Sequence, residues 1–120
     1  MKKKNGKFKT LYDTQIMFQN YITSIPHLPA DDIKWNNYHM LALSEEIGEL
    51  LKADKRWKTH RNEHFDPENK LEEIADCLIT LMNVSIFSGF ESSDVLDAVE
   101  NKIKTNFTKL ELKERREINE

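Results

Sequence analysis

The sequence predicts an all-α fold, a four-helix bundle whose core is completed by homo-oligomerisation. Four segments repeat apolar residues at helical spacing, and nothing longer than isolated residue pairs has a strand pattern. Turn-forming residues fall between those segments. Hydrophobic residues make up 38% of the chain and charged residues 32%, so either many charges line helix exteriors or a partner subunit completes some of the apolar surface.

Turn and capping residues set the boundaries of the four expected helices. The first helix has a loose apolar rhythm, with Asp13 or Thr14 as its cap. Asp66 followed by Pro67 is a good start for the third helix, and Gly89 is a suitable stop for it. The expected helices cover residues 11–25, 35–57 and 71–88, and Ser92 or Ser93 is expected to cap a fourth, which frays beyond residue 110.

Two details of composition predict how these helices pack. The third helix is apolar nearly all round, which is typical of a central, buried helix. Gly48 lies inside the second helix, where it costs about 1 kcal/mol relative to alanine. We therefore expect another helix or a ligand to approach closely at Gly48.

The chain is expected to form one domain, residues 11–110, between a basic flexible tail, residues 1–10, and a charged helix end or tail, residues 111–120. The net charge of −3 argues against a general nucleic-acid binder, and we expect no stable nucleic-acid partner. The single cysteine, Cys77, cannot form an internal disulfide. With neither a signal peptide nor a membrane span in the pattern, we expect a cytoplasmic protein.

Two acidic pairs are the strongest functional signal. Glu46 and Glu49 lie one turn apart on the second helix, and Glu73 and Asp76 do the same on the third. Both pairs border apolar residues, where a carboxylate is costly unless a cation compensates it. Carboxylate ligands without histidine partners favour Mg²⁺, or Mn²⁺, and four of them make more than one ion plausible. Such a site suits phosphate oxygens and in-line displacement by water.

Basic, amide and aromatic residues provide the remaining candidates. The basic run at residues 52–61, which includes Lys55, leaves the helix that bears Glu46, and the fourth helix offers Lys102. Either can balance phosphate charge, although a solvated surface lysine is the commoner role. Amides can read a base edge and tryptophan can stack on a base, although core packing is its commoner role. The candidates for base contact are Gln15, Gln19, Trp35, Asn36 and Trp57.

The segments from Glu45 to Glu49 and from Glu73 to Asp76 resemble the E-E-x-x-E … E-x-x-D signature of the MazG-like all-α nucleoside triphosphate pyrophosphohydrolases. That superfamily includes the dimeric dUTPases and the dCTP pyrophosphatases. The resemblance implies a helical bundle that forms a homodimer or homotetramer. It also implies Mg²⁺-dependent cleavage of a nucleoside triphosphate between the α and β phosphates, giving the monophosphate and pyrophosphate.

The resemblance also assigns roles to individual residues. It makes Glu46, Glu49, Glu73 and Asp76 the metal ligands, with Glu46 and Glu49 catalytic and Glu46 directing the attacking water. Glu45 takes a supporting role beside these ligands. Lys102 and Asn106 match a K-x-x-x-N segment that touches phosphates and sugar. Lys109, a further phosphate candidate, stands where relatives often have arginine. Thr80 stands where some relatives have tyrosine, so base-reading details do not carry over.

Two other functions fit parts of the pattern. A helical regulatory module that binds nucleotide or metal without hydrolysis would keep the carboxylates but lack cations for the phosphates. A structural or nucleic-acid adaptor would use the lysine-rich start of the chain and the basic run at residues 52–61. The sequence pI of about 5.8 makes the adaptor the weakest of the three.

Overall fold

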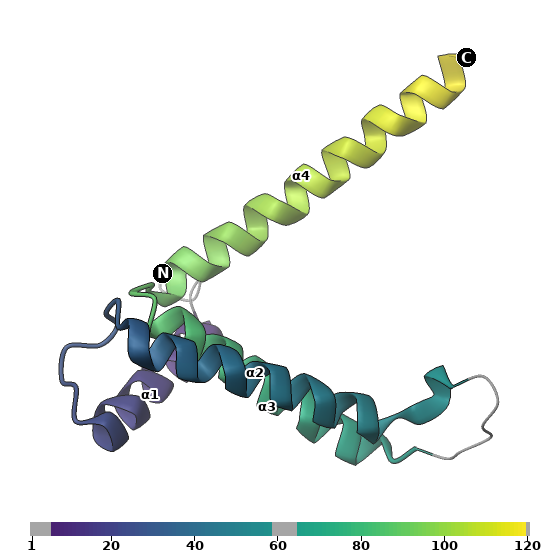
Figure 1. The fold of residues 1–120 in the computed structure, drawn as a ribbon. Coiled ribbons are helices and arrows are strands. Elements are labelled where there is room, and N and C mark those ends of the chain that lie inside the picture. The colour runs from purple at the N-terminus through teal and green to yellow at the C-terminus, as the bar shows by residue number, and fades with distance from the viewer. Residues whose placement is uncertain (1–5, 59–64, 120) are drawn as a thin grey trace.

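The computed structural model describes residues 6–58 and 65–119 of the chain. Within these ranges it contains four α-helices, one short 3₁₀ helix and no strand, so the all-α prediction is confirmed. Figure 1 shows α2 and α3 side by side, with α1 beside one end of this pair and α4 leading away from that end. The elements are α1 (Gly6–Thr23), α2 (Ile33–Ala53), η2 (Lys55–Trp57), α3 (Pro67–Ile86) and α4 (Ser92–Asn119).

Carboxylates begin both helices of the central pair. Asp32 accepts a hydrogen bond from the backbone N–H of Trp35, 2.9 Å away, and so caps α2. Asp66 accepts from the N–H of Glu68 at 3.0 Å, with Pro67 in the first turn, which confirms the expected start signal of α3. The helix therefore begins at the proline, four residues before the apolar pattern does.

Other helix ends differ from the expected ones. Helix α1 already begins at Gly6, so the predicted caps Asp13 and Thr14 are wrong. Asp13 instead pairs with Lys9 one turn earlier, at 2.6 Å. A side chain can cap only where backbone N–H groups lack helical partners, and these residues lie a full turn or more inside the helix.

The start of α4 also corrects the sequence prediction. Ser92 is its first helical residue and is not the cap. The carboxylate of Asp94 accepts a hydrogen bond from the backbone N–H of Glu91, 2.8 Å away. Helix α4 then continues to Asn119 and does not end near residue 110.

The buried core is small and lies where α1 meets the C-terminal end of α3. Its fully buried side chains include Tyr12, Ile86 and Phe87. The hydroxyl of Tyr12 donates to the carbonyl of Phe90 at 2.7 Å. From α2, the ring of His39 stacks on Phe87 with the ring centres 5.2 Å apart. This core joins α1, α2 and α3 at one end of the molecule.

The prediction that α3 is central and buried is wrong for the single chain. Leu71, Leu78 and Leu81 are 66%, 58% and 48% exposed. The expected close approach at Gly48 is not made within the described chain, because no atom lies within 4 Å of the position a side-chain Cβ would take. A helix that is apolar all round is buried only where neighbours cover every side, and here α2 and α1 cover only part of α3.

Helix α4 does not close a four-helix bundle within the chain. Its main packing partner is α1, and Figure 1 shows it pointing away from the α2–α3 pair. The radius of gyration is 18.6 Å, whereas a compact chain of 120 residues would have one of about 14 Å. None of the helices in the described residues is both long enough and apolar enough to span a membrane.

Candidate metal centre

Three of the predicted carboxylates meet between α2 and α3. Glu46 comes from α2, and Glu73 and Asp76 come from successive turns of α3. One carboxylate oxygen from each lies within 4.8 Å of the others. Glu46 and Glu73 are half-buried and Asp76 is exposed, so the predicted burial of these acids holds only in part. Oxygen ligands at this spacing and open to solvent on one side suit a hard divalent cation that keeps some of its water.

The electrostatics of this acidic trio, Glu46, Glu73 and Asp76, favour a cation. Partial burial raises the pKa of Glu73, and the negative charges of Asp76 and Glu46 raise it further. Burial also raises the pKa of the Cys77 thiol, and the negative charges of the trio raise it further. The thiol therefore stays protonated at neutral pH.

Glu49 does not join the trio in this structure. It lies one turn beyond Glu46, its side chain is 53% exposed, and its carboxylate is 3.6 Å from the ammonium of Lys52. Its charge still contributes to the raised pKa of Glu73. Glu45 is exposed and lines a shallow hollow with Tyr38 and other residues of α2.

Asp54 holds the far end of the α2–α3 pair together, and the sequence analysis missed it. Its carboxylate lies 2.8 Å from both Arg56 and Lys70, and it also accepts from the backbone N–H of Arg56. Hydrogen bonds from Arg56 and then Lys70 hold the pKa of Asp54 well below its usual range. The sequence signal that could have identified Asp54 is an aspartate followed two residues later by an arginine, which is a local turn pattern.

Trp57 lies beside this cluster, near the acidic trio. Its indole is 58% exposed, and its Nε1 donates to the carbonyl of Leu51 at 3.2 Å, which fixes the ring. The surface hollow next to it has a volume of about 290 Å³. One wall residue, Leu50, is one turn from Glu46, and another, Lys70, is one turn from Glu73. The hollow is lined by Leu50, Leu51, Asp54, Trp57, Lys70 and Ile74.

The predicted amides on α1 face α3. Gln15 donates to the side-chain oxygen of Asn83 at 2.9 Å. Gln19 is only 2% exposed, and its side-chain oxygen lacks a hydrogen-bond partner among the described residues. Nε2 of His39 on α2 is likewise buried and unpaired there. The sequence analysis missed Asn83 and His39, because a single polar residue on an apolar helix face does not reveal its neighbours.

Two other base-contact candidates are occupied by internal contacts. Trp35 stacks on Phe87 with ring centres 6.0 Å apart and packs against the core. Asn36 donates to the carbonyl of Val84 at 3.0 Å and to the hydroxyl of Ser88 at 2.7 Å. Both side chains join α2 to the end of α3, which is a structural role.

The predicted phosphate ligands lie on two separate parts of the molecule. Lys55 belongs to η2, just beyond the acid-bearing stretch of α2. Lys102, Asn106 and Lys109 lie on the exposed length of α4, which packs mainly on α1. The chain's own fold therefore does not place the α4 residues on the acidic trio.

Comparison with known proteins covers nearly the whole described chain. The family model described as dUTPase matches residues 7–119. This match includes both acid-bearing helices and all but the first residue of α1. No curated protein and no solved structure matches the chain.

Proposed function

The chain belongs to the dUTPase family, and from that premise we propose that it is a divalent-metal-dependent nucleoside triphosphate pyrophosphohydrolase. The reaction consumes one water, breaks the bond between the α and β phosphates, and releases a nucleoside monophosphate and pyrophosphate. The observation that supports this most is the convergence of Glu46, Glu73 and Asp76 from two helices. The family makes dUTP the first substrate to test.

The proposed roles follow the position of each carboxylate. Glu46, Glu73 and Asp76 would hold Mg²⁺ or Mn²⁺, with Glu49 as a further ligand from the next turn of α2. One such ion, or a pair, would supply Lewis-acid polarisation of the phosphate. Glu46 orients the attacking water and accepts its proton, because it faces the α3 carboxylates across the helix pair. Glu45 supports the α2 ligands from the neighbouring position.

Contact with the base is proposed at two places. Trp57 presents an exposed indole face to a hollow one helical turn from the acidic trio, and stacking on a base suits such a face. Gln15, beside Asn83, and Gln19, whose buried amide oxygen has no partner among the described residues, carry polar groups of the kind that read a base edge. Trp35 is left out because its ring is engaged in the core.

A panel assay tests this function. Purified protein is incubated with Mg²⁺ and each canonical deoxynucleoside and ribonucleoside triphosphate, dUTP included, and products are separated by anion exchange. We expect monophosphate and pyrophosphate in equal amounts, and none when a chelator removes the metal. Diphosphate and inorganic phosphate as products would contradict cleavage between the α and β phosphates. A folded protein inactive on every nucleotide would contradict the enzyme proposal.

One observation favours the non-hydrolysing alternative, a helical module that binds nucleotide or metal. In the single chain, Lys102 and Lys109 lie on a helix that diverges from the acidic trio, so phosphate charge there is poorly balanced. Calorimetry that shows Mg²⁺-dependent nucleotide binding, with intact triphosphate recovered afterwards, would favour this module over the enzyme.

A further inference from the structure

Trp57 presents its aromatic face from a segment that is too short to hold its own position. It ends η2, a 3₁₀ helix of 3 residues, and its indole is 58% exposed. The hydrogen-bond geometry of so short a helix is poor. One contact fixes the ring directly, because Nε1 donates to the carbonyl of Leu51 at 3.2 Å. The rest of η2 must be held by contacts with neighbouring elements.

Asp54 makes several of these contacts at once. It caps η2 by accepting from the backbone N–H of Arg56 at 3.1 Å. Its two carboxylate oxygens also accept from Nε and Nη2 of the Arg56 guanidinium, at 2.9 and 2.8 Å, which makes the pair bidentate. One of these oxygens lies 2.8 Å from Nζ of Lys70 on α3. The Asp54 side chain is only 11% exposed, so the carboxylate is largely shielded from water.

The ring of Phe65 contacts the same two cations that Asp54 holds. The guanidinium carbon of Arg56 lies 3.4 Å from the centre of the ring, and Nζ of Lys70 lies 5.6 Å from it. Both distances are within the range of a cation–π contact. The carboxylate and the ring therefore tie η2 to the start of α3. We call these four residues, Asp54, Arg56, Phe65 and Lys70, the Asp54 cluster.

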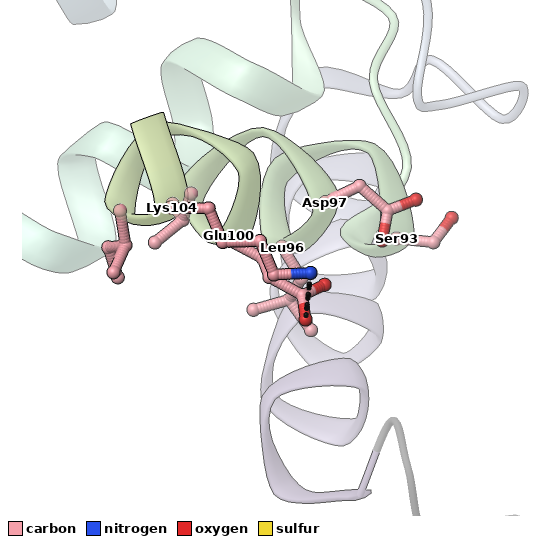
Figure 2. A pocket seen from close by; sticks show the side chains of 7 residues that line it. Ser93, Leu96, Asp97, Glu100 and Lys104 are labelled. Atoms are coloured by element: carbon pink, nitrogen blue, oxygen red, sulfur yellow. Dashed lines mark ion pairs between the residues drawn. The ribbon is translucent and has the colours of Figure 1, made fainter. Parts of the chain in front are cut away.

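The Asp54 cluster and the indole share one hollow. Asp54, Trp57 and Lys70 all line the hollow of about 290 Å³ near the acidic trio, and its other walls come from α2 and α3. Figure 2 shows a larger hollow, about 670 Å³, which is lined by α4 alone. The ion pair on its wall, Glu100 with Lys104, joins two residues of that same helix. Of the two hollows, the one beside Trp57 is therefore the one whose walls are held by contacts between elements.

A ring that is fixed before a base arrives binds the base more tightly than a mobile ring. Stacking of a base on an aromatic side chain is worth about 5- to 160-fold in affinity by alanine substitution. Ordering a mobile side chain during binding costs part of this gain, whereas a ring already in its bound position keeps it. The Asp54 cluster can therefore control affinity without touching the nucleotide.

We propose that Asp54 is a positioning residue for the base: through Arg56 and Lys70 it holds η2 against the start of α3, and this keeps the Trp57 indole in place as a stacking face beside the metal centre. The inference rests on the proposed function, because it takes Trp57 as a base contact. Its sign distinguishes it from a plain charge effect. Loss of the Asp54 charge leaves two cations unbalanced, which by electrostatics alone would strengthen binding of an anionic triphosphate. Loss of positioning weakens that binding.

Steady-state kinetics at saturating Mg²⁺ separate the two effects. The substrate is dUTP, or whichever triphosphate of the panel is hydrolysed fastest. Asp54→Asn keeps an acceptor for the cap of η2 but cannot balance two cations. We expect its KM to rise about 5-fold or more while kcat stays within about 2-fold of wild type, because stacking on the base is the same in the ground and transition states. An unchanged or lowered KM would overturn the proposal.

Arg56→Lys provides a second variant that keeps the charge. It loses the bidentate pair with Asp54 and the planar contact with Phe65, so KM should rise in the same direction. The Arg56 side chain is exposed, so this variant tests the proposal even if Asp54→Asn does not fold. A wild-type KM in Arg56→Lys would overturn the route through Arg56.

A double variant tests whether Asp54 acts through the indole. Trp57→Ala should raise KM at least as much as Asp54→Asn does. Adding Asp54→Asn to Trp57→Ala should raise KM no further, because the ring that Asp54 positions is then absent. Increases that multiply in the double variant would overturn the link between Asp54 and Trp57.

The indole N–H signal reports the position of the ring without any nucleotide. In the NMR spectrum of isotope-labelled protein, the Nε1–H resonance of Trp57 is identified by its loss in Trp57→Phe. We expect Asp54→Asn and Arg56→Lys to move it toward the position of an indole in water, because the bond to Leu51 weakens. An unmoved resonance in both variants would overturn the positioning role.

Tyr12→Phe is the control for a loss of stability alone. It removes a hydrogen bond at the core end of the molecule and should keep the wild-type KM and indole signal. An equal rise of KM in Tyr12→Phe would overturn the proposal in favour of general destabilisation. A wild-type chain without activity would overturn the proposed function and this role with it. A wild-type KM in Asp54→Asn beside a raised KM in Trp57→Ala would overturn the positioning role alone.

Discussion

Glu73 combines the two features that distinguish a functional carboxylate from a surface one. It is half-buried, and it faces Glu46 and Asp76 with no cation among the described residues paired to it. An ionised carboxylate in such surroundings costs folding free energy that an opposite charge would offset. A bound cation explains the placement of this carboxylate better than a contribution to stability does.

A substitution at Glu73 should separate stability from metal binding. Glu73→Gln removes the disfavoured charge, so the unfolding temperature without metal should equal or exceed that of wild type. Added Mg²⁺ should raise the unfolding temperature of wild type and leave the variant unchanged, because a ligand that binds the folded state stabilises it. Activity should fall by more than the 10–100-fold that loss of a group behind the ligands costs.

Glu72→Gln is the matched control for this substitution. Glu72 is the exposed neighbour of Glu73 and lies outside the trio. It should keep both the Mg²⁺ effect and the activity. An Mg²⁺ effect that survives in Glu73→Gln would count against the trio as the metal site.

The buried His39 should make stability depend on pH. Burial lowers the pKa of His39 from its ordinary value of 6.5. Below pH 6.5 the unfolded chain therefore binds a proton that the folded chain does not, and the free energy of unfolding falls with falling pH. The slope from this one group is at most about 1.4 kcal/mol per pH unit.

Urea unfolding at pH 7.5 and 5.5 measures this effect. His39→Phe keeps a ring against Phe87 and should reduce the loss of stability between the two pH values. His27→Phe, in the exposed loop after α1, should keep the wild-type loss. Equal slopes in all three proteins would show that another group controls the pH dependence.

At the scale of helices, two polar contacts link neighbouring elements. Asp54 links the end of α2 and η2 to Lys70 on α3, at the end of the pair away from the core. Tyr12 links α1 to Phe90, just before α4 begins. Each contact lies where two elements meet, so its loss should weaken the packing between those elements and leave the helices themselves intact.

Asp54→Asn should lower the unfolding midpoint at pH 7, and this difference in stability from wild type should disappear at low pH. The folded-state pKa of Asp54 is lowered from 3.8, so the stabilisation is present above pH 3.8 and is lost as pH falls through the folded value below it. The two proteins should therefore converge at the lowest pH at which both remain folded. Asp97→Asn, on exposed α4, should match wild type throughout. A constant difference at every pH would rule out the ionised carboxylate as the cause.

Tyr12→Phe removes one hydrogen bond and no packing. The carbonyl of Phe90 loses its partner, and we expect a loss of about 1 kcal/mol in the free energy of unfolding. Denaturant titration measures it. Tyr21→Phe, at a position that is 81% exposed, should change stability by less than about 0.5 kcal/mol. A similar loss in both variants would contradict the role of the Tyr12 hydroxyl.

At the scale of the whole molecule, the fold is a helix pair with a small core at one end and a long helix projecting from it. The radius of gyration of 18.6 Å and the exposed apolar residues of α4, such as Ile103 and Phe107, are the features on which the expectation of a homo-oligomer depends. Folding and association should therefore be linked.

Linked folding and association should make stability depend on protein concentration. Over a 100-fold dilution we expect the unfolding temperature to fall steadily, because dissociation favours the unfolded chain by mass action. The unfolding temperature of Thr105→Lys, a substitution at an exposed position of α4, should fall in parallel with that of wild type. An unfolding temperature that does not change with concentration would show that the single chain is stable by itself.

The sequence predicted those features that depend on local spacing. Apolar periods revealed the helices, and Asp66 before Pro67 marked the start of α3. Glu73 and Asp76 share a face because a helix places residues three apart on adjacent turns. The structure brings Glu46 to them, because α2 and α3 pack side by side.

Features that depend on neighbouring elements were not predictable in the same way. The Asp54–Lys70 ion pair and the stacking of His39 on Phe87 join residues far apart in the chain, and nothing adjacent in the sequence identifies those partners. The burial expected for α3 was wrong because periodicity shows which faces are apolar but not which chain covers them.

The sequence by itself thus determined the helices, their order, and the acidic turns on the second and third of them, because helix geometry converts spacing directly into position. Only the tertiary structure decided which carboxylates converge, which amides are buried, and that α4 leaves the pair it was expected to cover. Those outcomes depend on packing between distant segments, where a shift of one turn changes every contact.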